Sequence, residues 1–128
     1  MLGLTKNIDY GLDLMIVLGK NFNKGPISLS KIAKEKKIPY KFLGKLALIL
    51  KQAGLVEAKE GKGGGYFLKE NPSKISVADV VEVLGGPVEV GHCSGCSRMS
   101  VCGQKDVWAE VGDKVRETIE EKSLKDLL

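Results

Sequence analysis

Three cysteines gather within one short segment of this 128-residue chain, at Cys93, Cys96 and Cys102. The same segment holds His92, which is the only histidine. An odd, clustered set of thiols is a poor framework for disulfides, whereas thiolates are good ligands for zinc and for iron–sulfur clusters. The pattern therefore predicts a metal or cluster site with the three cysteines as ligands and His92 as a candidate fourth ligand. Free thiols on a loop are the alternative.

A second group of residues has the charge needed to bind a polyanion. Residues 20–62 contain eleven lysines and only three acidic residues. A helix predicted over residues 39–53 exposes Lys41, Gly44 and Lys45 opposite its apolar face, with Tyr40 near its start. Glycine inside a helix costs about 1 kcal/mol relative to alanine, and a close approach of the backbone to a ligand would explain that cost. The alternative is an ordinary solvated lysine face.

A glycine-rich turn forms the third feature, Gly61-Lys62-Gly63-Gly64-Gly65-Tyr66. A hairpin of this composition can bring its backbone close to a phosphate or a narrow groove, with Lys59 and Lys62 as cations. The turn is not a Walker loop, because no Gly-Lys-Ser/Thr follows the four spacer residues that this motif requires. A plain flexible turn is the alternative.

The elements that position these residues follow from hydrophobic periodicity and capping signals. Helices are predicted over residues 4–21, 29–37 and 39–53, and Ser28 can cap the second of them. Strands at 55–59 and 66–68 form a hairpin, and Ser76 with Asp79 predicts a capping box that opens a fourth helix through residue 83. A last helix starts near Gln104. The fold class is therefore mainly α with a small β-hairpin, a winged helix-turn-helix plus a long C-terminal helix.

The last helix carries an apolar stripe, which predicts packing on a partner chain. The stripe consists of Val107, Trp108, Val111, Val115 and Ile119. We therefore divide the chain into a winged helix-turn-helix DNA-binding domain at residues 1–86, a cluster-binding cysteine loop at 87–103, and a dimerisation helix with a C-terminal turn at 104–128. A two-fold homodimer would space two recognition helices for a pseudo-palindromic operator on double-stranded DNA. Packing of the helix on its own domain is the alternative.

Composition sets the broad class of the protein. The chain is 43% hydrophobic, 28% charged and only 5% aromatic, with a net charge of +4. These values fit a compact domain with an aliphatic core. No apolar run approaches the roughly 20 residues of a membrane span, and the first residues lack the pattern of a signal peptide. We expect no membrane association and a cytoplasmic location.

Several of these motifs together resemble the Rrf2 family of bacterial transcription regulators. The resemblance rests on Leu4-Thr5 with the first helix, the glycine-rich wing, the cysteine loop, and Trp108 and Leu124-x-x-Leu127 beyond it. It implies a homodimeric winged-helix protein with a long dimerisation helix. In family members with three cysteines it also implies a [2Fe–2S] or [4Fe–4S] cluster that senses iron–sulfur status, nitric oxide or redox state.

The resemblance also suggests which residues hold the cluster. Cys96 and Cys102, with five residues between them, match the second and third cluster cysteines of the family. The usual position of the first is Val90 here, and Cys93 stands three residues later. Some members use a histidine where this chain has Lys105.

For the fourth ligand, the resemblance points to an acidic residue. Other family members supply one from the first helix of the partner subunit, and Asp9 stands at that position. Asp9 is therefore the preferred fourth ligand, with His92 and then Asp13 as alternatives. In the wing, Glu60 replaces the arginine that some members place in the minor groove, so Lys59 or Lys62 would take that part.

The sequence thus predicts a homodimeric DNA-binding regulator of transcription that senses redox state, nitric oxide or iron–sulfur status through its cluster. The residues predicted to contact DNA are Ser28, Tyr40, Lys41, Gly44, Lys45, Lys59, Lys62 and Gly63. A zinc-bound or thiol-based regulator of the same family, without a cluster, is the alternative. An enzyme such as a thiol oxidoreductase is disfavoured, because Cys93-x-x-Cys96 does not open a helix after a strand.

Overall fold

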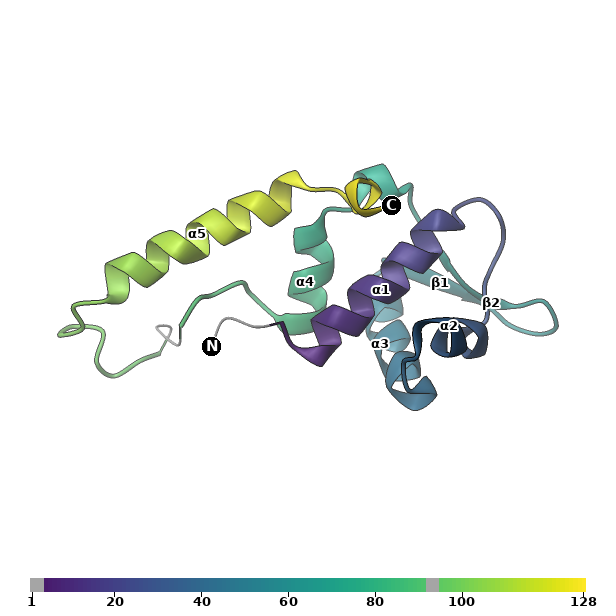
Figure 1. The fold of residues 1–128 in the computed structure, drawn as a ribbon, viewed down its shortest axis with the longest axis horizontal. Helices are drawn as coiled ribbons and strands as arrows, with labels where there is room; N and C mark the ends of the chain where they lie inside the picture. Colours follow the sequence, from purple (N-terminus) through teal and green to yellow (C-terminus); the bar gives the residue numbers. More distant parts are fainter. Residues whose placement is uncertain (1–3, 92–94) are drawn as a thin grey trace.

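Three helices precede a β-hairpin in the computed structural model, which describes residues 4–91 and 95–128. The helices are α1 (Lys6–Lys20), α2 (Leu29–Lys36) and α3 (Tyr40–Gln52). The hairpin consists of β1 (Val56–Lys59) and β2 (Gly65–Leu68), and α4 (Val77–Gly85) follows a short 3₁₀ turn, η1 (Pro72–Lys74). This order confirms the predicted winged helix-turn-helix. In Figure 1, α1 runs across the domain and packs against α3 and α4.

Local capping sets the helix ends, and several of them differ from the predicted ends. The first helix begins at Lys6, because the Thr5 side chain accepts a hydrogen bond from the Ile8 backbone N–H at 3.4 Å. Leu4 therefore lies outside the helix and is exposed. Lys37 ends α2 in the left-handed conformation, with φ at 57°. The predicted capping box of Ser76 and Asp79 is confirmed, and α4 continues to Gly85, beyond its predicted end.

The hairpin is antiparallel and gains a third short segment that the sequence did not predict. Its register runs from Val56 opposite Leu68 to Lys59 opposite Gly65. Ile27 pairs with Tyr66 through two backbone hydrogen bonds, of 3.0 Å and 2.8 Å. A Cβ on Gly65, where φ is +150°, would collide with the Ile27 backbone, so glycine is required there. The wing is thus attached to the residues that lead into α2.

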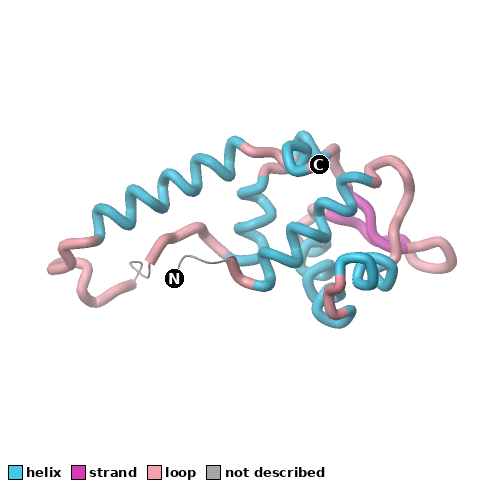
Figure 2. The backbone as a smooth tube through the Cα atoms, in the orientation of Figure 1, coloured by secondary structure: helices cyan, strands magenta, loops and turns pink. Residues whose placement is uncertain are grey.

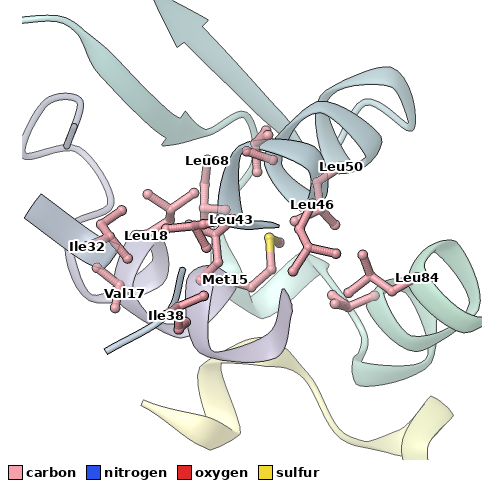
Figure 3. Close-up of a cluster of buried hydrophobic side chains, with 14 of the residues drawn as sticks. Met15, Val17, Leu18, Ile32, Ile38, Leu43, Leu46, Leu50, Leu68 and Leu84 are labelled. Atoms are coloured by element: carbon pink, nitrogen blue, oxygen red, sulfur yellow. The ribbon is translucent and has the colours of Figure 1, made fainter. Parts of the chain in front are cut away.

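The core is aliphatic, as the composition predicted. Leu14, Met15 and Leu18 of α1 are completely or almost completely buried. Figure 3 shows Met15 and Leu18 among side chains from the other helices, the turn before α3 and the wing, including Ile32, Ile38, Leu43, Leu46, Leu50, Leu68 and Leu84. The predicted inward face of α3 is confirmed, because Leu43, Leu46, Ala47 and Leu50 are all buried. The opposite face of α3 is consequently directed away from the core.

The C-terminal part forms a long arm that returns to the domain. After α4 the chain leaves the domain in a loop, and α5 (Lys105–Glu121) leads back to a 3₁₀ turn, η2 (Leu124–Leu127) (Figures 1 and 2). Leu124 is fully buried, and its N–H donates to the Ile75 carbonyl at 2.7 Å. The C-terminal end of α5 is therefore fixed to the domain, while its N-terminal end lies far from it. None of the helices within residues 4–91 and 95–128 has the length and apolarity to span a membrane.

Candidate nucleic-acid interface and metal centre

The outer face of α3 carries the residues predicted to contact DNA. Lys41 and Lys45 are exposed, and Tyr40 is 58% exposed at the first turn of the helix. A Cβ built on Gly44 has no other atom within 4 Å, so internal packing does not require glycine at this position. Leu48 also belongs to this face and is 50% exposed. Leu48 was not predicted as part of this face, although it lies four residues after Gly44 and therefore on the same side of the helix.

Ser28 lies at the start of α2, directly after the residue that pairs with the wing. The Ser28 hydroxyl caps α2 by accepting a hydrogen bond from the Lys31 N–H at 3.3 Å, as predicted. Ser28 follows Ile27, the residue that pairs with the wing, so it marks the junction of the two elements. Ser28 is exposed and can still donate its hydroxyl proton.

The wing supplies the remaining predicted contacts. Lys59, Lys62 and Gly63 are all exposed, and Gly63 adopts a positive φ of 77°. The tip of the wing projects at the end of the molecule opposite the cysteine loop (Figure 1). Within residues 4–91 and 95–128, the lysines predicted to contact DNA form no ion pair. Their charges are available for phosphates.

Two of the predicted cluster ligands lie in the described part of the loop. Cys96 and Cys102 are both free thiols and both are partly exposed. The Cys96 Sγ accepts a hydrogen bond from the Arg98 backbone N–H at 3.4 Å. His92 and Cys93 lie outside the described residues. The loop therefore presents two accessible thiols close to the start of α5.

The predicted carboxylate ligands lie elsewhere in the same chain. Asp9 is exposed in the first turn of α1, and Asp13 is half-buried one turn later. Figure 1 shows α1 within the domain and the cysteine loop at the far end of α5. In the part of the chain that the structure describes, no three His, Cys, Asp or Glu side chains are placed to share a metal ion. Among the described residues, the structure therefore does not bring Asp9 or Asp13 to the thiols of Cys96 and Cys102 in the same chain.

The predicted apolar stripe of α5 is covered only in part by its own chain. Gly112 is the only buried residue of this helix. Val107 is 55% exposed and Val115 is 40% exposed. The helix contacts α4, and Trp108, Val111 and Ile119 are half-buried, so the chain covers one part of the stripe and leaves the other part exposed.

A helix-turn-helix followed by a wing is a fold of DNA-binding regulators. The chain belongs to the Rrf2 family of transcriptional regulators. The family profile, described as an iron-dependent transcriptional regulator, matches residues 4–128. This match confirms the predicted family, which is a family of regulators and not of enzymes.

Known relatives agree with this assignment in sequence and in fold. The chain is similar to the transcriptional regulator CymR of Bacillus subtilis, with 33% identity over 118 residues, 92% of this chain and 83% of that one. The solved structure of CymR, the global cysteine regulator of B. subtilis, superposes with a TM-score of 0.84 over 99% of this chain and 96% of that chain, at 33% identity. The structure of IscR from T. potens gives 0.82 at 30% identity, over 98% of this chain and 85% of that one. These structural matches confirm the predicted fold class.

Proposed function

We propose that this regulator is a homodimer that binds DNA and senses redox state, nitric oxide or iron–sulfur status through an iron–sulfur cluster on its cysteine loop. The observation that carries the proposal is the position of Cys96 and Cys102, two accessible free thiols at the remote end of α5. The iron dependence in the description of the family supports the choice of metal.

The donor set suits a [4Fe–4S] or [2Fe–2S] cluster. Thiolates are the usual ligands of both, and Cys93 would complete three thiols within ten residues. Asp9 of a second chain is the preferred fourth ligand, as the family resemblance implies, and its carboxylate is exposed in the first turn of α1. His92 and Asp13 remain alternatives. A bound cluster would supply a centre whose charge and ligation change on oxidation or nitrosylation.

The exposed part of the α5 stripe supports the dimer. Burial of apolar surface contributes about 25 cal/mol per Å², so a second chain that covered Val107 and Val115 would stabilise both chains. A two-fold pair of α5 helices would also place two winged domains side by side for a pseudo-palindromic operator.

The two cations of α3 and the two of the wing would neutralise phosphates. Lys41, Lys45, Lys59 and Lys62 are exposed and form no ion pair within the described ranges. Tyr40, Gly44, Ser28 and Gly63 would then lie close enough to contact the bases or the backbone.

A change of geometry at the cysteine loop can reach the DNA-binding domain through α5, because the C-terminal end of this helix is fixed to that domain. The helix has 17 residues, which corresponds to about 25 Å. Its C-terminal end is held by Leu124 and by the Lys122 carbonyl, which accepts a hydrogen bond from the Val77 N–H at 2.8 Å. A change of geometry at the loop would thus move a rigid arm attached to α4. A shift in operator affinity requires only that the cluster stabilise one arm position over another.

Variants of the loop test this function. We expect Cys102→Ser to lose bound iron and to change the affinity for operator DNA isolated from a random pool. Ser100→Ala, two residues away in the same loop, should change neither. Retention of iron and unchanged DNA affinity in Cys102→Ser would contradict the cluster proposal, and failure of the wild-type dimer to select any DNA would contradict the regulator proposal.

A zinc-bound or thiol-based regulator without a cluster is the second candidate. The exposure of Cys96 and Cys102 favours it, as does the similarity to the global cysteine regulator of B. subtilis. This candidate predicts a colourless protein, with zinc or no metal, whose DNA affinity changes when the thiols are oxidised.

A further inference from the structure

The outer face of α3 carries an apolar side chain among its lysines. Leu48 follows Gly44 by four residues and Lys41 by seven, so the three lie on one stripe of the helix. Lys45, three residues before Leu48, lies beside it on the same stripe. Leu48 is 50% exposed, whereas the adjacent Ile49 packs against the core. Leu48 is therefore directed to the side of the helix that is predicted to contact DNA.

The packing of the domain does not account for leucine at this position. The helix contacts α1, α2, α4 and β1. Its buried face is centred on Leu43, Leu46 and Leu50, roughly opposite Leu48 around the helix axis. A single exposed leucine is ordinary on a protein surface, so exposure alone does not indicate a contact. The position of Leu48 within a stripe of cations does indicate one.

The spacing of this stripe is suited to reading bases. In the homeodomain, another helix-turn-helix fold, the recognition helix reaches base edges through residues separated by three, one and three positions. The same spacing separates Lys41, Gly44, Lys45 and Leu48. A Cβ on Gly44 would meet no other atom within 4 Å, and the residue itself has no side chain to hold DNA away. The helix backbone can therefore come close to the base pairs, as a short leucine side chain requires.

The chemistry of this face restricts which base pairs it can recognise. The sequence of α3 contains no Asp, Glu, Asn, Ser or Thr, and its one side-chain amide is Gln52 at the last position. Lysine can donate to the O6 and N7 atoms of guanine or to phosphates, whereas leucine makes only apolar contacts. The C5-methyl of thymine is the apolar group that the four bases present in the major groove. Thymine is thus the base that matches Leu48.

We propose that Leu48 determines part of the sequence specificity by packing against the methyl group of a thymine in each half-site of the operator. This inference rests on the proposed function, because it takes α3 as the helix that enters the major groove. It adds a requirement that phosphate contacts by lysines do not impose, namely a thymine methyl group at one fixed position.

Replacement of thymine by deoxyuridine tests the contact, because it removes the methyl group and leaves the base pairing unchanged. The wild-type protein would first select operator DNA from a random pool, and each thymine of a selected half-site would then be replaced in turn. At one position, the affinity measured by fluorescence anisotropy should fall about fourfold, the value for one buried methyl group. The other positions should show little change.

Variants of Leu48 assign this methyl group to its side chain. Leu48→Ala should fold, since the position is exposed and alanine favours a helix. It should bind the thymine and deoxyuridine operators equally, both more weakly than the wild type binds thymine. Leu48→Met keeps an apolar side chain and should retain the preference for thymine. Leu127→Ala is the matched control, because it shortens an exposed leucine of η2, and it should behave like the wild type.

Three results would overturn this inference and leave the proposed regulator function intact. The first is a selected operator whose affinity survives every deoxyuridine replacement. The second is an equal loss in the wild type and in Leu48→Ala, because another residue or the shape of the DNA would then read the methyl group. The third is reduced self-association of Leu48→Ala with an unchanged preference for thymine, which would assign this face to a contact with a second copy of the chain. Failure of the wild type to select any DNA would instead contradict the proposed function, and this inference with it.

Discussion

The Gly44→Ala variant distinguishes the effect of this position on the stability of the fold from its effect on DNA binding. Gly44 lies inside α3, and an added Cβ would have no neighbour within 4 Å. Alanine should therefore gain its full helix propensity and stabilise the protein by about 1 kcal/mol. For a chain of 128 residues this corresponds to a rise in Tm of about 3–5 °C.

The same methyl group should weaken DNA binding if α3 enters the groove with Gly44 against the DNA. Insertion of a methyl group into a close-packed contact costs about 1–3 kcal/mol, a loss of about five- to 150-fold in operator affinity. Thermal unfolding and fluorescence anisotropy on labelled operator DNA measure the two effects. Gly112→Ala in α5 is the control, with a gain in stability and unchanged DNA affinity. A stabilised Gly44→Ala that binds DNA like the wild type would refute the placement of Gly44 at the interface.

Three further changes test other parts of the structure. Leu124→Ala removes a fully buried side chain and should destabilise the protein by about 2–5 kcal/mol in urea unfolding. Lys41→Met should reduce the slope of log affinity against log salt concentration by about 1, since one phosphate contact is lost. The backbone N–H of Ser123, with help from nearby lysines, holds the pKa of Asp126 below its ordinary value. The charged carboxylate therefore stabilises the fold above about pH 4, the ordinary pKa, and this contribution disappears as the pH falls through the lowered value. Asp126→Asn should have a lower Tm than the wild type at pH 7 and an equal Tm at strongly acidic pH.

Each of these changes has a control or a contradicting result. Leu127→Ala, at an exposed position of the same turn, should cost much less than Leu124→Ala. Lys114→Met should leave the salt slope unchanged, because its charge lies on α5 beside Glu117. A Tm difference for Asp126→Asn that is independent of pH would show that the carboxylate charge does not stabilise the turn.

Local sequence signals were sufficient for the elements of the winged domain. The apolar spacing of Leu43, Leu46 and Leu50 predicted the inward face of α3, and the capping signals of Ser28 and Ser76 predicted the starts of α2 and α4. These features depend on residues within one or two turns of each other, so a single sequence contains the necessary information.

Contacts between distant segments were not predictable in this way. The pairing of Ile27 with Tyr66 and the burial of Leu124 beside Ile75 join residues about forty or more positions apart, without any local pattern. The hydrogen bond from the Arg116 guanidinium to the Val88 carbonyl was missed for the same reason, because it joins two segments that meet only in the folded chain. For the metal site, the kinds of ligand residue were predictable, with Cys96 and Cys102 among them. Their arrangement with Asp9 requires a second chain and stays a prediction.

The most direct test of the proposed sensing function is the iron and acid-labile sulfide content of the protein after anaerobic purification, recorded with its visible absorption spectrum. The proposal predicts a brown protein with iron and sulfide in equal amounts, and loss of both in Cys102→Ser. A colourless wild-type protein that contains zinc or no metal would contradict the cluster and would move the sensing chemistry to the thiols themselves.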